Sequence, residues 1–178
     1  NTTTELDITS QTIDLNADAV NNILDIGDSA TTFPGFYDTG YDASGDIIKF
    51  LDDTRVDPGL VYFLDDNSGS PEWALVDPDT TTKGDSQLLA IALGSNSNEG
   101  MLLKGYIRIN SSLYDGTALA GAPLYLHAPG GTATGKLSFT VPSTSGNIVR
   151  IAGHCIVKDG SNNILVYFNP STEWIERA

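Results

Sequence analysis

The chain has 178 residues, of which 40% are hydrophobic, and its formal net charge is −14. So acidic a surface repels phosphate groups, which excludes nucleic acids and anionic membrane surfaces as expected partners. No stretch approaches the roughly 18 apolar residues of a transmembrane helix, so no membrane insertion is expected. The length is sufficient for one sizeable core, and the 18 glycines and eight prolines between short apolar runs are typical of an all-β domain.

Residues 1–32 differ from the rest of the chain. Residues 1–85 carry 18 acidic and three basic side chains, whereas residues 86–178 carry five acidic and six basic ones. Within this acidic half, short apolar clusters such as Leu6-Asp7-Ile8 and Ile13-Asp14-Leu15 recur about every seven residues. One such strand cannot bury its apolar face alone, but identical strands of neighbouring subunits can bury it. The pattern predicts a short, elongated, shaft-like β segment over residues 1–32, with a flexible acidic tail as the alternative.

Residues 33–178 are predicted to form a compact antiparallel β-barrel or sandwich. The run from Leu88 to Leu93 is apolar at every position, which is typical of a strand buried on both faces; a short helix ended by Gly94 is the alternative. After a polar loop, the next run ends in alternation, with Tyr106 and Arg108 on one face and Ile107 and Ile109 on the other.

Two pseudo-repeats, about 46–110 and 117–170, are predicted within this domain. Gly59–Leu64 is similar to Gly121–Leu126, the Leu88 strand to Ile148–Val157, and the Met101 strand to Ile164–Phe168. The offsets between equivalent positions are all roughly 60 residues. Chance similarity between short strands is the alternative interpretation.

Aspartates in two loops are candidate metal ligands. Asp65, Asp66, Asp77 and Asp79 supply hard oxygen donors of the kind that calcium prefers. Their spacing does not match an EF-hand loop, and solvated turn residues are the alternative. Structural calcium is therefore a hypothesis, and no other cofactor is expected.

No catalytic constellation is convincing. His154 and Cys155 are adjacent in an apolar run, where neighbouring strand residues point to opposite faces, so they do not predict a Cys–His dyad. No Gly-x-Ser-x-Gly motif supports a nucleophilic serine. The lone Cys155 is expected to be a small core residue. We expect a protein that is not an enzyme.

Several motifs together resemble a C-terminal domain of tailed-bacteriophage virion proteins, of the tail-fibre or spike-like class. The resemblance covers roughly residues 45–178, and residues 6–27 look like the rung repeats of fibre shafts. The motifs that carry it are Gly59-Leu-Val-Tyr-Phe-Leu-Asp65, Trp73-Ala-Leu-Val-Asp77, Leu89-Ala-Ile-Ala-Leu-Gly94, Gly100-Met-Leu-Leu-Lys-Gly105, Ile148-Val-Arg-Ile-Ala-Gly153, Tyr167-Phe-Asn-Pro170 and Glu173-Trp-Ile-Glu176.

The resemblance implies a virion structural role in an extracellular particle, as the distal part of a tail fibre or spike that attaches to the host surface. It also implies a homotrimer that contacts other virion proteins and a host-surface glycan or protein. A capsid decoration protein and a secreted carbohydrate-binding module are the alternatives. For glycan binding, the candidate stacking residues are Phe36, Tyr37, Tyr41, Trp73 and Tyr114; core or interface packing is the alternative role for each.

Overall fold

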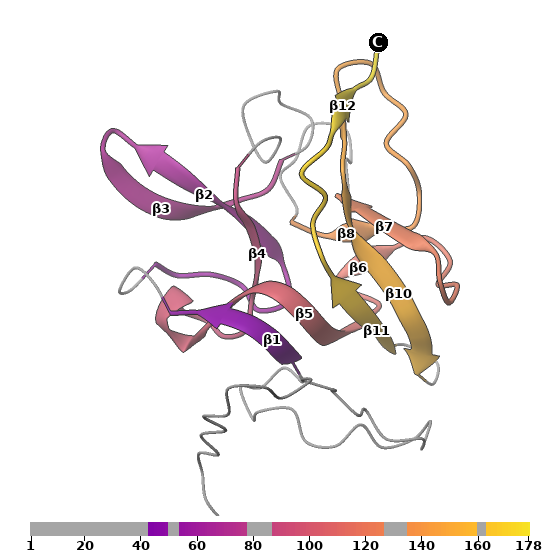
Figure 1. The fold of residues 1–178 in the computed structure, drawn as a ribbon, viewed down its shortest axis with the longest axis horizontal. Coiled ribbons are helices and arrows are strands. Elements are labelled where there is room, and N and C mark those ends of the chain that lie inside the picture. Colours follow the sequence, from indigo (N-terminus) through magenta and orange to yellow (C-terminus); the bar gives the residue numbers. More distant parts are fainter. Residues whose placement is uncertain (1–42, 50–53, 78–86, 127–134, 160–162) are drawn as a thin grey trace, which may run out of the picture.

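The computed structural model of the chain describes residues 43–49, 54–77, 87–126, 135–159 and 163–178 (Figure 1). The predicted shaft segment, residues 1–32, lies outside these ranges, as do Phe36, Tyr37, Tyr41 and Asp79. What the sequence predicts for them stays a prediction.

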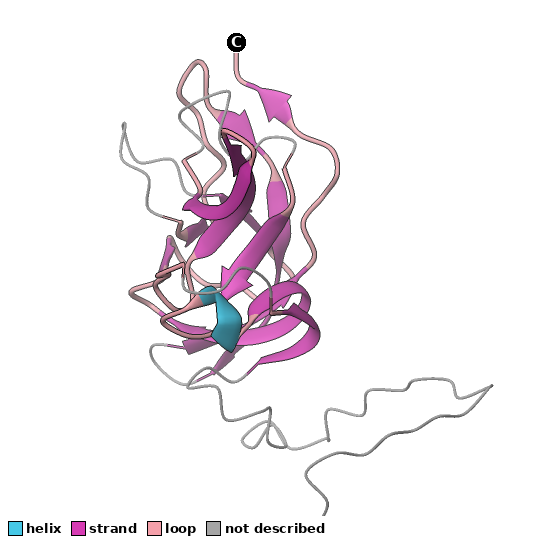
Figure 2. Cartoon of the chain, turned by 90° about the vertical axis from the view of Figure 1, so that its left-hand side faces the viewer, coloured by secondary structure: helices cyan, strands magenta, loops and turns pink. Residues whose placement is uncertain are grey.

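The described residues form strands joined by loops and one short helical turn, η1, Ser97–Glu99 (Figure 2). This strand content confirms the predicted all-β class. In the described ranges, no helix has the length and apolar character that crossing a membrane requires. The strands are β1 Ala43–Ile48, β2 Val61–Asn67, β3 Ser70–Leu75, β4 Leu89–Ala92, β5 Met101–Asn110, β6 Tyr114–Asp115, β7 Pro123–Leu126, β8 Leu137–Ser138, β9 Ile148–Val149, β10 Ile151–Asp159, β11 Asn163–Phe168 and β12 Ile175–Glu176.

In the main sheet, the two halves of the strand order have corresponding patterns of pairing. The order is β3-β2-β4-β5-β11-β10-β7-β8-β6, and β12 pairs with β9 in a separate two-stranded ribbon. In the first half, β2 pairs with β3 and β4, and β4 pairs with β5. In the second half, β7 pairs with β8 and β10, and β10 pairs with β11. The two four-strand units, which join between β5 and β11, thus have the same order of pairing.

Strand β5 is the corner at which the two halves diverge. Its first residues pair with both β4 and β1, and its middle residues pair with both β11 and β1. Because a strand has only two edges, β4 and β11 share one edge of β5 and β1 occupies the other. The sheet therefore curls, with β2–β4 on one side and β7, β10 and β11 on the other (Figure 1).

Glycines permit the close crossing of strands at this corner. Gly45 and Gly105 are directly opposite each other in β1 and β5, with φ angles of 147° and 145°. A Cβ atom on Gly105 would lie 2.1 Å from the Ser44 carbonyl oxygen, and one on Gly45 would lie 2.1 Å from the Lys104 carbonyl oxygen. No side chain fits at either position, because the backbones of β1 and β5 approach each other closely there.

The main core fills the space between the two halves. Both halves contribute fully buried side chains, among them Val61, Phe63, Leu89, Ile91, Leu93, Leu102, Ile107, Leu124, Leu126, Cys155, Val166 and Phe168. Burying a large apolar side chain of this kind stabilises the fold by about 1.5–3 kcal/mol.

A second core lies on the outer face of the first half only. It contains Val56, Tyr62, Trp73, Ala90, Ala92 and Met101. The segment 54–60 covers it, since Val56 belongs to this core, Leu60 packs against it, and Asp57 N–H donates to the Tyr62 hydroxyl at 2.7 Å. Strand β4 is thus buried on both faces, as the sequence predicts, whereas Leu88 just before it is 48% exposed.

Candidate functional site

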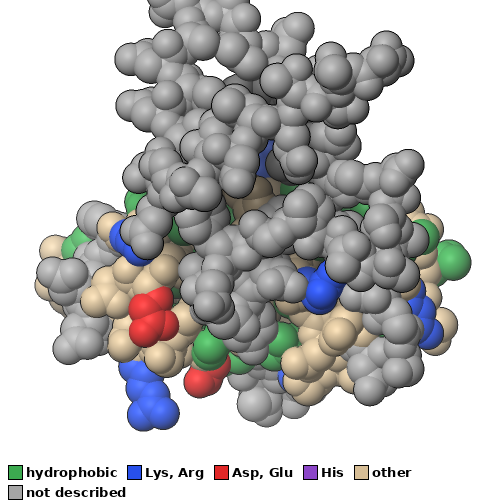
Figure 3. All heavy atoms as spheres, turned by 90° about the horizontal axis from the view of Figure 1, so that it is seen from below, with side chains coloured by type: hydrophobic (Ala, Val, Ile, Leu, Met, Phe, Trp, Pro, Cys, Tyr) green, Lys and Arg blue, Asp and Glu red, His purple; other side chains and the backbone are tan. Residues whose placement is uncertain are grey.

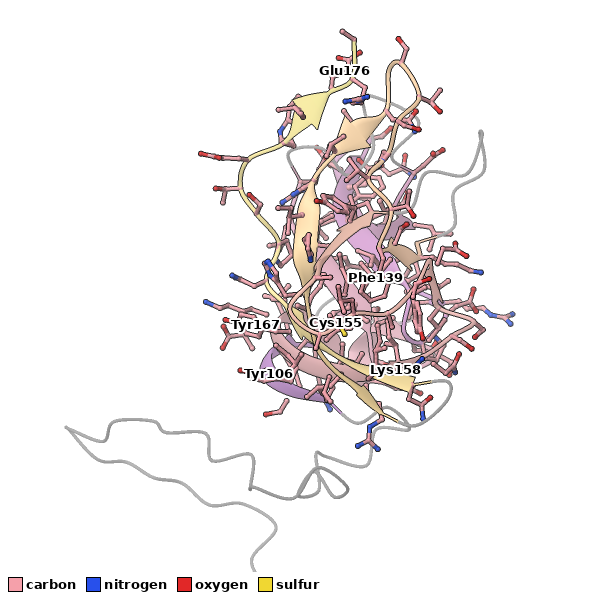
Figure 4. All side chains as sticks on the ribbon, turned by 90° about the vertical axis from the view of Figure 1, so that its right-hand side faces the viewer. Tyr106, Phe139, Cys155, Lys158, Tyr167 and Glu176 are labelled. Carbon is pink, nitrogen blue, oxygen red and sulfur yellow. The ribbon has the colours of Figure 1, made fainter. Side chains whose placement is uncertain are left out.

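Two tyrosines lie side by side on the outer face of the second half. Tyr106 of β5 and Tyr167 of β11 are directly opposite each other in the antiparallel pair, so their side chains emerge on the same face. Their ring centroids are 5.0 Å apart and the rings are tilted by 37°. Both side chains are half-buried, and they point outward while Cys155 points into the interior (Figure 4). The pair presents aromatic surface to solvent.

A hollow of about 520 Å³ lies beside this pair. It is lined by the backbone of Gly45 and Gly105 and by Ser44, Asp46, Lys104 and the two tyrosines. The hollow therefore combines two aromatic rings, a hydroxyl, a carboxylate and an ammonium group. Convergent polar groups around an aromatic surface are typical of small-ligand sites; from here on we call it the tyrosine hollow.

The row of the tyrosine pair continues across the second half. Tyr167 is directly opposite His154 of β10, which in turn is opposite Pro123 of β7. His154 is exposed, whereas the adjacent Cys155 is fully buried, as strand alternation predicts. Burial raises the pKa of the Cys155 thiol above its ordinary value, so Cys155 is a neutral core residue.

A groove of about 370 Å³ adjoins the tyrosine hollow, because Lys104 lines both. Arg150, which lies between β9 and β10, forms part of the groove and is only 6% exposed. Its Nε donates to the Ser171 carbonyl at 2.8 Å and its Nη1 donates to the Gln87 carbonyl at 3.1 Å. These two bonds fix the guanidinium between segments far apart in sequence; we call this site the Arg150 groove.

Trp73 and Tyr114 are not the exposed stacking residues that the sequence suggested. Trp73 is 4% exposed and belongs to the second core, beneath the segment 54–60. Tyr114 is 8% exposed and packs edge-to-face on Phe139, with ring centroids 5.7 Å apart. Both side chains have the alternative role, core packing, because strand pairing places them on buried faces.

The structure separates the described members of the predicted calcium set. Asp65 and Asp66 lie at the tip of the β2–β3 hairpin, where Asp66 Oδ1 accepts from Gly69 N–H at 2.8 Å and Asp65 Oδ1 from Asp66 N–H at 2.9 Å. Asp77 follows β3 at the other end of that hairpin. Within the described ranges, no group of three or more His, Cys, Asp or Glu side chains is arranged to hold a metal ion.

The tyrosine hollow was predictable from the sequence only in part. The alternation from Tyr106 to Ile109 correctly places Tyr106 on the outer face. What single-strand reasoning missed is the register that puts Tyr167 opposite Tyr106, because this pairing joins the two halves of the domain. The available clue was the predicted equivalence of the Met101 strand and Ile164–Phe168, since equivalent strands of two pseudo-repeats can pair where the repeats meet.

The described surface that is visible in Figure 3 is chemically mixed. Viewed from the side of β1 and β5, the visible described surface carries apolar, acidic and basic side chains interspersed with polar ones (Figure 3). The tyrosine hollow itself is distinguished by the aromatic pair that lines it.

Comparisons with known proteins give no relative of this chain. No family model, no curated protein and no solved structure matches it.

Proposed function

We propose that this chain is a virion attachment domain, the distal part of a phage tail fibre or spike, and that it binds host-surface glycans in the tyrosine hollow. The virion role is supported by the resemblance of the motifs between residues 45 and 178 and by the acidic, rung-like pattern of residues 1–32. Binding, and not catalysis, is the role for which the hollow offers chemistry.

The observation that carries glycan binding is the Tyr106–Tyr167 pair. Sugar rings have an apolar face of C–H groups and a rim of hydroxyls, and a tyrosine offers an electron-rich ring face to the C–H groups and a hydroxyl to the rim. The two half-buried rings offer the apolar contact. Asp46 and Lys104 lie beside them, and a carboxylate accepts hydrogen bonds from sugar hydroxyls while an ammonium donates them.

Rigidity of the platform also supports the proposal. The rings stand on the central β5–β11 pair, which is hydrogen-bonded from Gly105–Phe168 to Asn110–Asn163. The opposite face of both strands is buried in the main core. A binding surface on paired strands over a packed core loses little conformational freedom when a ligand binds.

A glycan array tests this proposal directly. Tyr106→Ala and Tyr167→Ala should each weaken binding of any glycan that the unmodified protein captures by about tenfold or more, the size of an aromatic hot spot. Tyr125→Ala is the matched control, since Tyr125 is also half-buried, on β7, and does not line the hollow. Equal binding by all four proteins, or equal loss in the Tyr125 variant, would contradict the assignment of the hollow.

The proposed fibre role includes a homotrimer assembled through residues 1–32. Light scattering of the whole chain against a chain starting at Phe33 measures this. A trimer that weakens or dissociates on truncation supports a fibre end organised by its shaft. A monomer in both cases would instead favour a secreted carbohydrate-binding module, the second candidate, because the tyrosine hollow serves that function without assembly.

A further inference from the structure

We infer that the Arg150 groove and the tyrosine hollow are two subsites for one acidic glycan, with a carboxylate-bearing sugar in the groove and a neighbouring neutral sugar on the tyrosines. This inference rests on the proposed glycan binding and adds the class of ligand. It is carried by the residues that line the groove and by the lysine that the two sites share.

The groove has the polarity that an anionic ligand requires. Its lining includes Arg150 and Lys104, and among the described residues that line it there is no carboxylate. This contrasts with the chain as a whole, whose net charge is −14. Asp46, directly opposite Lys104, lines the tyrosine hollow and not the groove. A sugar carboxylate therefore meets cations in the groove, whereas it would meet Asp46 in the hollow.

Arg150 is a cation held in place before any ligand arrives. Only 6% of the Arg150 surface is exposed. The backbone carbonyls of Ser171 and Gln87 accept hydrogen bonds from its Nε and Nη1. A guanidinium stays charged at every physiological pH, so its positive charge attracts an anion that enters the groove. Because the protein has already ordered this side chain, an anion that binds in the groove does not have to order it.

The remainder of the groove suits a sugar ring more than a small inorganic anion. Leu88, Leu103 and Pro170 provide apolar surface, and Leu88 is 48% exposed. Asn169 and Thr172 provide an amide and a hydroxyl, which donate to and accept from sugar hydroxyls. Cations, apolar surface and neutral hydrogen-bonding groups within about 370 Å³ match a uronic or sialic acid residue.

Lys104 joins the two subsites. It is exposed on β5, two residues before Tyr106, so both side chains emerge on the outer face of the strand. A ligand that spans the groove and the hollow passes this ammonium group. Lys104 is therefore the position at which a single substitution changes the charge seen by the acidic sugar without removing the buried guanidinium.

The experiment is an array of acidic oligosaccharides, each printed beside its carboxyl-reduced neutral form, probed with the whole chain. We expect the acidic member of a bound pair to be captured about tenfold more tightly, and this ratio to fall as salt is raised. Lys104→Gln should reduce the ratio about threefold or more, and Lys104→Arg should retain it. Lys158→Gln is the matched control, since Lys158 is an exposed lysine at the far end of β10 that lines neither subsite.

The outcomes separate this inference from the proposed function. If acidic and reduced forms bind equally and Tyr106→Ala abolishes both, glycan binding stands and the acidic subsite is wrong. If sulfated but no carboxylated glycans bind, the carboxylate assignment is wrong. If Lys158→Gln lowers the ratio as much as Lys104→Gln, the preference for acidic glycans comes from general charge attraction and the assignment of the groove is wrong. If no glycan of either form binds, the inference and the glycan-binding proposal fail together.

Discussion

The two halves of the sheet share a pairing order but differ in how many faces they bury. In the first half, β2 and β4 are covered on one side by the main core and on the other by the second core beneath the segment 54–60. In the second half, the same main core covers one face, and the outer face of β10 and β11 leaves Tyr167 half-buried and His154 exposed. Leu165 is an exception, since it is buried and belongs to neither core. The candidate ligand surface, the tyrosine hollow, lies on the outer face of β5 and β11, which the second core does not cover.

Corresponding strands explain this difference at the level of residues. Strand β4 has no polar side chain, and all of Leu89–Ala92 is buried. Its counterpart β10 alternates, with buried Cys155 next to exposed His154 and Ile156. The same pairing order thus occurs with two patterns of burial: the apolar strand β4 lies between two layers, and the amphipathic strand β10 has one layer and leaves His154 and Ile156 exposed to solvent.

Replacing an aromatic residue in each half gives the largest expected contrast. Trp73→Ala removes a buried indole from the second core and should lower the free energy of unfolding by about 3–5 kcal/mol. Tyr167→Ala removes a half-buried ring and should lower it by about 1 kcal/mol. Urea denaturation measures both. Losses of equal size would mean that the outer face of the second half is as structural as the second core.

Gly105→Ala should be the next most damaging change, because it affects the corner shared by the two halves. The new methyl would meet the Ser44 carbonyl oxygen at a φ of 145°, and we expect a loss of about 3 kcal/mol together with loss of ligand binding in the hollow. Gly121→Ala is the control, since its φ is 79° but no atom lies within 4 Å of the added Cβ. The Gly121→Ala substitution should cost about 1 kcal/mol, the penalty for a Cβ atom at a positive φ. Similar melting temperatures for the two variants would show that the close approach of β1 and β5 is unimportant.

Local pattern was sufficient for the fold class and for the faces of individual strands. The continuous apolar run at β4 predicted burial on both faces, and the alternation in β5 predicted which residues face the core. Period-two and unbroken apolar patterns act through a few neighbouring residues, so one sequence contains them.

The candidate site could not be predicted in the same way because it is assembled from distant segments. Tyr106 and Tyr167 meet only through the β5–β11 register, and Arg150 meets Gln87 and Ser171 across the fold. For the same reason Trp73 could not be told from an exposed aromatic: its burial depends on segment 54–60, which precedes it and folds back over β2 and β4.

Tyr62→Phe sharpens the comparison within the second core. The Tyr62 hydroxyl accepts from Asp57 N–H at 2.7 Å and so ties the covering segment to β2. Removing it should lower the free energy of unfolding by about 1 kcal/mol and leave ligand binding unchanged. Tyr125→Phe, a half-buried tyrosine of the second half, is the matched control in the same urea titration. A variant as stable as the unmodified protein would show that burial alone holds the segment.

Alkaline pH should affect both halves, and the variants separate their contributions. Burial is the main cause that raises the pKa of Tyr62 in the first half, and it also raises the pKa values of Tyr114 and Cys155 in the second. Folded chains therefore hold these protons more tightly than unfolded chains do. The stability that this difference contributes is fully present below the unfolded-state pKa values, 9.0 for the thiol and 10.0 for the phenols, and it falls as the pH rises above them. The thiol titrates before the phenols, so Cys155→Ala should flatten the first decline in urea midpoint, near pH 9, and Tyr62→Phe should mainly flatten the later one. A first decline of unchanged slope in Cys155→Ala would assign it to groups outside the core of the second half.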